Sequence, residues 1–270
     1  MPIVARVINA QVARNQSKVR YRSRLIPSFL LPRPFQLLTL CGLVALCAGN
    51  LMAAQVELAR DEARRRQASQ RAPSSAEEVL QRALDARGGK VAAARIRSIR
   101  GKGTADFAWG GRCDFESFAA RPNQSRGVFD FEGGSRYEFA CDGPTAWEIR
   151  PGTDPEMQSG AKLEEARDHA AWFAEYDDPR TYRSVAFAGQ TLFEGTRCYE
   201  LKLVTQSGRE KTHYYNATNY LLAGAVDRVT VETNSFKRTI KFLEYRMFAG
   251  VWLATRFRVW TDEGECVVRL

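Results

Sequence analysis

The sequence has few of the residues and motifs that most enzymes use for catalysis. It contains two histidines in 270 residues, His169 and His213, and neither stands at zinc-ligand spacing from a second histidine or a carboxylate. No G-x-S-x-G turn is present to expose a nucleophilic serine. Gly101-Lys102-Gly103 and Gly133-Gly134 are not followed by a helical pattern, so neither is a phosphate-binding loop. We therefore expect two surface histidines and no catalytic residue, metal site or cofactor.

Acidic residues are scarce in the first part of the chain. Residues 1–72 hold 12 Lys and Arg but only three Asp and Glu, which accounts for the whole formal net charge of +9, whereas residues 73–270 hold 28 of each sign. Binding to a phosphate backbone needs a basic face on the folded part of a protein. The balanced charge after residue 72 predicts that nucleic acid is not a partner.

The chain begins with a segment that is typical of exported proteins. Met1–Pro34 carries seven basic residues and no acidic one, and Phe35–Leu46 is an apolar stretch of the length found in signal peptides. Small residues before Gln55 suit cleavage at that point. Residues 1–54 are therefore predicted to be a signal peptide or an N-terminal membrane anchor that uses residues 35–54. Both alternatives place the rest of the chain in the periplasm or cell envelope.

The spacing of the cysteines is not typical of a metal site or of a disulfide framework. The four that follow the leader lack paired C-x-x-C steps, and four in about two hundred residues is too few for a disulfide scaffold. If one strand separates Cys113 from Cys141, the two lie about 9 to 10 Å apart, which is too far for a disulfide. We expect all four to be small buried hydrophobic residues, namely Cys113, Cys141, Cys198 and Cys266.

Residues 55–72 are charged and have no apolar stripe, which indicates a linker, and the folded domain is expected over 73–270. Two overlapping capping boxes and apolar residues at helical spacing predict a helix over Ser75–Arg87. A short second helix is expected at Lys90–Ala94. A third is expected at Ala161–Phe173, with an apolar face formed by Leu163, Ala166, Ala170 and Phe173.

The rest of the domain reads as short strands of alternating polarity separated by turn residues. The tight turns require antiparallel neighbours, and a sheet of about 11 to 12 strands is expected to curl into an unclosed barrel covered by the two or three helices. The predicted strands are Ser98–Trp109, Arg112–Ala120, Gln124–Phe131, Ser135–Cys141, Thr145–Arg150, Ser184–Phe193, Arg197–Val204, Glu210–Asn216, Leu221–Val231, Phe236–Arg246, Val251–Thr261 and Glu265–Leu270.

Four stretches of the sequence resemble the LolA-like superfamily of outer-membrane lipoprotein carriers and lipoprotein-sorting proteins. Asp142 to Trp147 is similar to the D-G-x-x-x-W hairpin of that superfamily, and the other similar stretches are Val79–Ile99, Tyr214–Leu222 and Phe242–Phe257. The resemblance covers nearly all of the domain. It implies an unclosed barrel, lined by aromatic and aliphatic side chains and covered by helices, that accepts acyl chains.

The alternation of the strands agrees with such a cavity, since Phe115, Phe129 and Phe139 fall in the apolar phase of consecutive strands while Asp114 and Glu138 fall in the other. The cavity candidates are Phe107, Phe115, Phe129, Phe131, Tyr137, Phe139, Leu163 and Phe173, each of which could equally be ordinary core. The family gives one strand arginine the role of tying the lid to helix-end carbonyls, and the candidates for it are Arg112 and Arg126.

The sequence thus predicts an exported, non-catalytic binding protein for lipid or lipoprotein acyl chains. Inner-membrane lipoprotein-release proteins and outer-membrane receptors are the partners that the resemblance implies. The alternative is a membrane-tethered envelope sensor or accessory module with the same fold and no transport role.

Overall fold

The computed structural model describes residues 57–60, 71–171, 182–231, 234–262 and 264–270. The chain divides into two compact units, Met1–Gln70 and Arg71–Leu270, and residues 57–60 of the first unit are helical. The predicted leader at residues 1–54 lies outside the described residues. Among the helices that the structure does describe, none has both the length and the hydropathy to cross a bilayer.

The second unit is built on one antiparallel sheet, with strand order β6-β5-β4-β3-β2-β1-β13-β12-β11-β10-β9-β8-β7. Because the row has two ends, β6 and β7, the sheet is not closed, and the predicted fold class is confirmed. The strands are β1 Ser98–Phe107, β2 Arg112–Ala120, β3 Gln124–Phe131, β4 Arg136–Cys141, β5 Ala146–Ile149, β6 Glu156–Met157, β7 Tyr182–Phe193, β8 Thr196–Thr205, β9 Glu210–Asn216, β10 Leu222–Val231, β11 Asn234–Phe248, β12 Val251–Thr261 and β13 Gly264–Arg269.

Within the described part of this unit, three helices accompany the sheet: α2 Ala76–Ala86, α3 Gly89–Arg95 and α4 Gly160–Ala170. The predicted cap of α2 forms, since the backbone N–H of Glu78 donates to Ser75 Oγ at 3.3 Å and the Glu78 carboxylate accepts from the backbone N–H of Ser74 at 2.9 Å. These caps satisfy N–H groups at the helix start that have no partner within the helix. The start of α2 is therefore fixed by local sequence.

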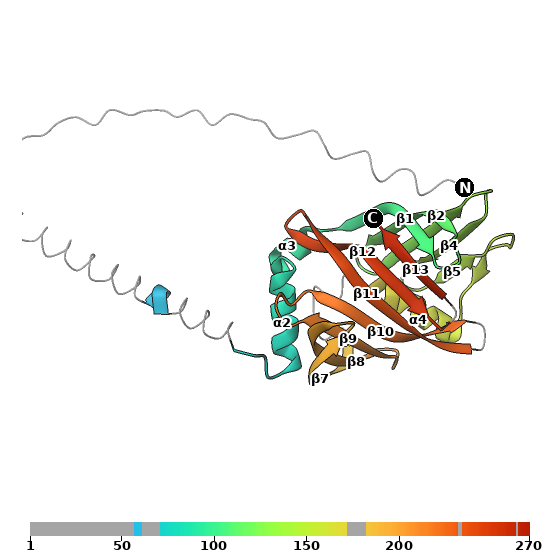
Figure 1. Ribbon diagram of the computed structural model, residues 1–270. Coiled ribbons are helices and arrows are strands. Elements are labelled where there is room, and N and C mark those ends of the chain that lie inside the picture. Colours follow the sequence, from blue (N-terminus) through green and yellow to red (C-terminus); the bar gives the residue numbers. More distant parts are fainter. Residues whose placement is uncertain (1–56, 61–70, 172–181, 232–233, 263) are drawn as a thin grey trace, which may run out of the picture. The chain divides into compact units, whose positions relative to one another are not determined.

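The sheet curls around α4 (Figure 1). This helix contacts β3, β4 and β5, and it also contacts β10. The two sets of strands are separated by β2, β1, β13, β12 and β11 in the strand order, so only a strongly curved sheet brings both to one helix.

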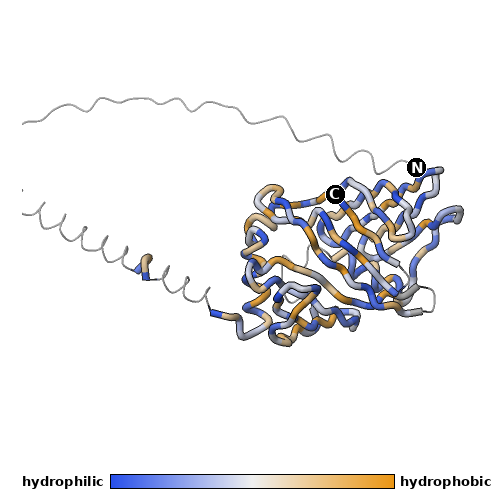
Figure 2. The backbone as a smooth tube through the Cα atoms, in the orientation of Figure 1, coloured by the Kyte–Doolittle hydropathy of each residue, from blue (hydrophilic) through white to orange (hydrophobic). Residues whose placement is uncertain are grey.

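Strand alternation decides which side chains face α4. Hydrophilic and hydrophobic residues alternate along the strands in Figure 2. Phe115 pairs with Phe129 and Phe129 pairs with Tyr137, so these three share one face. Arg126 pairs with Phe118 and Ala140 and has the opposite parity to Phe129. The inner face of this half of the sheet is therefore aromatic, as the alternation predicts.

The largest buried cluster lies under α2. Val79 of α2 and Leu201 of β8 are both fully buried there, and Leu203 of β8 is buried beside them. A second cluster on the inner face joins Ala105, Cys113, Phe115 and Val268. The four cysteines of the domain are free, and Cys113, Cys141 and Cys198 are buried as predicted, whereas Cys266 is half-buried.

Candidate functional site

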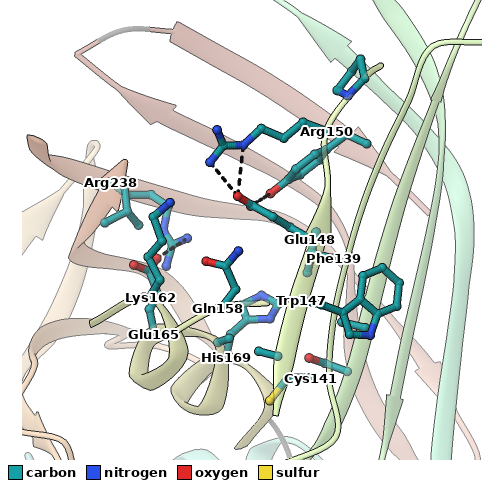
Figure 3. A pocket seen from close by; sticks show the side chains of 17 residues that line it. Phe139, Cys141, Trp147, Glu148, Arg150, Gln158, Lys162, Glu165, His169 and Arg238 are labelled. Carbon is teal, nitrogen blue, oxygen red and sulfur yellow. Dashed lines mark hydrogen bonds and ion pairs between the residues drawn. The ribbon is translucent and has the colours of Figure 1, made fainter. Parts of the chain in front are cut away.

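A cavity of about 560 Å³ lies between α4 and the strands β4 and β5, and we call it the α4 cavity. Phe139 of β4 and Trp147 of β5 line it on the sheet side, and Ala166 and His169 line it on the helix side. Figure 3 shows Lys162 and His169 of the helix on one side of the space and Glu148 of β5 on the other, whereas the ring of Trp147 points away from the helix. Its volume falls in the range of sites that hold small molecules, about 300 to 1,000 Å³.

The sheet side of the cavity is part of a longer aromatic row. The ring centroids of Phe139 and Tyr137 are 5.9 Å apart, those of Tyr137 and Phe129 are 6.0 Å apart, and those of Phe129 and Phe115 are 4.6 Å apart. Such separations are typical of packed aromatic pairs. The row carries an apolar surface from the α4 cavity across β4 and β3 to β2.

A glycine makes room for the ring at the cavity wall. Gly127 of β3 pairs directly with Phe139 of β4. A Cβ atom at residue 127 would collide with the Phe139 ring. Because Gly127 has no side chain, the ring lies across the neighbouring strand and forms part of the wall.

The eight cavity candidates divide into separate groups. Tyr137 and Phe139 line the α4 cavity. Phe107, Phe115, Phe129 and Phe131 belong to the neighbouring cluster on the inner face. Leu163 packs on Cys141, Ala146 and Ala170 beneath the helix, and Phe173 lies outside the described residues.

The face that α4 turns toward the cavity is more polar than expected. Lys162, Glu165 and His169 line the cavity together with Ala166. The apolar residues Leu163 and Ala170 are used to pack the helix on β4 and β5, so the adjacent face of the helix lies over the cavity. This corrects the expectation of an apolar face toward the cavity.

On the sheet side, the charged groups of the cavity are paired. Arg150 donates two hydrogen bonds to Glu148 Oε1, at 3.0 and 2.7 Å, and the hydroxyl of Tyr137 donates to the other oxygen of Glu148 at 3.2 Å. Burial, followed by the negative charge of Glu148, raises the pKa of Tyr137 to about 12. The Tyr137 hydroxyl is therefore a permanent donor at the cavity wall.

On the helix side, positive charge surrounds His169. Burial is the main cause that lowers the pKa of His169 to about 4, and the charges of Arg238, Lys211 and Arg209 lower it further, against the opposing effect of Asp227. His169 is exposed where it lines the cavity, and its lowered pKa keeps the ring neutral at neutral pH. The expectation of a surface histidine is wrong for His213, which is buried beside Tyr182 and Tyr215.

Two arginines fasten α4 at opposite sides. Arg167 donates to the carbonyl oxygens of Gly143 and Pro144 in the β4–β5 turn, at 3.0 and 2.8 Å. Arg209, which precedes β9, forms ion pairs with Asp168 at 3.4 Å and with Glu165 at 3.6 Å. The helix is therefore held by polar contacts to both halves of the curled sheet.

The predicted lid arginines bind elsewhere. Arg126 pairs with Glu138 at 2.5 Å, and Arg112 pairs with Asp106 at 3.6 Å. Both lie on the strand face opposite Phe115 and cannot reach the helices, so the expected role is corrected by strand parity. The helix-end carbonyls are bound instead by Arg121, which donates to Ile96 at 3.0 Å and to Ala93 at 3.2 Å.

Sequence reasoning missed Lys162, Glu165 and Arg238 as cavity residues. The first two stand three residues apart in the helix, with His169 four residues further on, a spacing that places all three on one face. That spacing was available in the sequence, but nothing there showed that this face turns toward the strands. Among the residues described, no group of His, Cys, Asp and Glu has the arrangement of a metal site.

No family model matches this sequence, and no curated protein matches it significantly. Solved structures do resemble it. A DUF1329 family protein from Desulfovibrio piger is 13% identical, with a TM-score of 0.48 over 70% of this chain and 90% of that one. A putative outer-membrane lipoprotein-sorting protein domain from Vibrio parahaemolyticus is 11% identical, with a TM-score of 0.43 over 71% of this chain and 88% of that one.

A LolA superfamily protein from Nitrosomonas europaea is 12% identical, with a TM-score of 0.49 over 73% of this chain and 91% of that one. At such identities the likeness concerns the fold. This solved structure carries the name of the superfamily that the sequence motifs resemble.

Proposed function

We propose that this protein is an exported, non-catalytic carrier that binds lipid or lipoprotein acyl chains reversibly in the α4 cavity. The observation that carries the proposal is the cavity of about 560 Å³, bounded by the aromatic side chains of β4 and covered by a helix of 11 residues. A site of this kind binds through apolar contact and has no need of a reactive group.

The energetics favour a carrier over a permanent binding site. Each buried methylene contributes about 0.8 kcal/mol, so a chain of about fourteen carbons gains on the order of 11 kcal/mol gross on leaving water. A membrane offers a similar gain, which means that an acyl chain can pass between the membrane and the protein cavity. Phe139, Tyr137 and the neighbouring Phe129 supply an apolar surface of the type that this exchange requires.

Movement of α4 is the proposed step of loading. The helix is held at its two sides by Arg167 and Arg209, and ion pairs and hydrogen bonds of this kind reform readily in water. An acyl chain that enters beneath the helix would occupy the space beside Ala166 and Phe139.

Native mass spectrometry of protein purified from bacteria tests the proposal together with displacement of a fluorescent fatty acid. We expect a co-purifying lipid and displacement by unlabelled acyl chains. Phe139→Ala should weaken probe binding, whereas Phe118→Ala on the opposite strand face should leave it unchanged. Absence of both a bound lipid and probe binding would refute the carrier function.

Export and partners form part of the same proposal. A mature N-terminus at Gln55 is expected for a soluble carrier, which would exchange its cargo with membrane-bound release or receptor proteins. If residues 35–54 are retained and the protein remains in the membrane fraction, the tethered accessory module becomes the better description. N-terminal sequencing of the fractionated protein distinguishes the two.

A further inference from the structure

We propose that the α4 cavity selects amphiphiles with an anionic headgroup, either a carboxylate or a phosphate, and that Lys162 is the counter-charge that binds this group. The inference rests on the proposed function, because it assumes that the apolar part of the ligand lies in the same cavity. It adds the chemical class of the ligand.

Lys162 is the charged residue of the cavity that lacks a partner. It lines the cavity and is half-buried, and it forms no ion pair or hydrogen bond with any residue that the structure describes. Its neighbours differ in this respect: Glu148 is bound by Arg150, and Arg238 is bound to Asp227 at 2.6 Å. A partly desolvated ammonium group gains stability when an anion approaches it. Its lack of a partner therefore indicates an anionic group as its complement.

The surroundings of Lys162 add to its positive charge. Arg238 lines the same cavity, and it acts together with Lys211 and Arg209 against protonation of His169. At the helix side of the cavity the positive charges of Lys162, Arg238, Lys211 and Arg209 outnumber the negative charges of Glu165, Asp168 and Asp227. A cationic headgroup would be repelled here, whereas an oxyanion would be attracted.

The helix places two suitable groups on one face. Lys162 and His169 are seven residues apart, which is about two turns, and both line the cavity. The neutral imidazole of His169 is able to donate one N–H to an oxygen, and Lys162 supplies the charge. Phe139 lies on the other side (Figure 3), and Tyr137 of the same strand also lines the cavity, so a headgroup at the helix leaves the chain against the aromatic wall.

Matched ligands separate the headgroup from the chain. We expect tetradecanoate to displace the fluorescent probe at about one-tenth of the concentration that tetradecanol requires, a difference of about 1.4 kcal/mol. The phosphate source is tested in the same way by comparing a monoacylglycerol phosphate with the uncharged monoacylglycerol. A preference in one pair alone identifies which oxyanion the protein selects.

Lys162→Met should abolish the preference for the acid over the alcohol, and Lys162→Arg should retain this preference. Lys202→Met, on an exposed position of β8, is the matched control and should keep the wild-type ratio. If a Lys162 variant does not fold, the acid-to-alcohol ratio of the wild-type protein still tests the inference.

Equal binding of the acid and the alcohol in both pairs, or a preference that survives Lys162→Met, overturns the anionic headgroup but leaves the carrier function standing. If the fluorescent probe does not bind, so that none of the four ligands can displace it, the proposed function itself is overturned. The two failures are therefore distinguishable.

Discussion

Arg209 holds helix α4 from the strand side through Asp168, with Nη1 of Arg209 3.4 Å from Oδ2 of Asp168. The same guanidinium reaches Glu165 at 3.6 Å and donates to the carbonyl oxygen of Arg228 at 2.6 Å. One arginine therefore joins two carboxylates of the cover helix to the backbone of β10.

Arg209→Met is predicted to loosen α4. Loss of contacts to charged groups of this kind costs about 1.5 to 3 kcal/mol, so amide exchange in α4 should accelerate about tenfold or more. Hydrogen exchange measured by mass spectrometry checks this, with exposed Arg183→Met of β7 as the control. Unchanged exchange in α4 would mean that other contacts hold the helix.

His169 is predicted to make stability depend on pH in a defined window. Its pKa is lowered by burial, and then by Arg238, to about 4, from an ordinary value of 6.5. Between these values the unfolded chain binds the proton more readily than the folded one. The contribution of neutral His169 to folding stability is therefore complete above the pKa of the unfolded state, and it is lost as the pH falls through this window.

Urea unfolding at about pH 7 and about pH 5 measures this dependence. His169→Gln should make the protein less sensitive to the change. An NMR titration of the imidazole gives an independent value, and a midpoint close to that of a free histidine would contradict the environment described for the ring.

Leu201→Ala is predicted to destabilise the domain by about 2 to 5 kcal/mol, because it removes a large side chain from the cluster beneath α2. Leu201 is fully buried, whereas Leu192 on β7 is 73% exposed. Leu192→Ala should change stability by no more than about 0.5 kcal/mol. Denaturant unfolding of the two variants provides the comparison, and similar losses would argue against the described core.

Glu138 is predicted to be the more important carboxylate of the outer face. It is 6% exposed, and it pairs with Arg126 at 2.5 Å and with Arg136 at 2.6 Å. Burial raises the pKa of Glu138, but the hydrogen bonds from the two arginines outweigh it and hold the pKa below its ordinary value. The contribution of Glu138 to folding stability is therefore present above the pKa of the unfolded state and is lost as the pH falls.

Glu138→Gln should cost about 1 to 3 kcal/mol at neutral pH. Asp130→Asn is the control, since the ion pair of Asp130 with Arg136 is longer, 3.6 Å, and more exposed. Thermal unfolding of both variants at neutral and acidic pH measures the difference. A loss for Asp130→Asn as large as that for Glu138→Gln would contradict this ranking.

Arg121→Met is predicted to release α3, because its side chain binds the carbonyl oxygens of Ala93 and Ile96 at the end of that helix. The expected cost is about 1 to 2 kcal/mol, accompanied by faster amide exchange in Gly89–Arg95. Exposed Arg97→Met serves as the control. Circular dichroism and hydrogen exchange together show whether the loss is confined to α3.

The parts of the fold that were predictable depend on local rules. Alternation of Phe115 with Asp114 fixed the inner face of β2, and Ser75 with Glu78 fixed the start of α2. The strand β6 was missed because two residues, Glu156 and Met157, are too few to show alternation. Its pairing with β5 depends on a neighbour rather than on its own sequence.

The candidate site was less predictable because it depends on how elements turn toward one another. Tyr137 and Phe139 follow from strand parity and were predicted to line a cavity. The rotation of α4 about its axis is set by Leu163 packing on Cys141 and Ala146, a contact between distant segments. That rotation brings Lys162 and His169 to the cavity, and no local pattern contains it.

The strand β7 ends the sheet and has a consequence for self-association. Its 12 residues form a long edge, and unpaired backbone groups along such an edge invite a strand from another molecule. Its pairing with β8 shifts between Phe187 and Gly189, where Gly189 has a φ of 105°. An irregularity of this kind twists the edge and breaks its hydrogen-bonding row, which makes β7 a poor template for intermolecular aggregation.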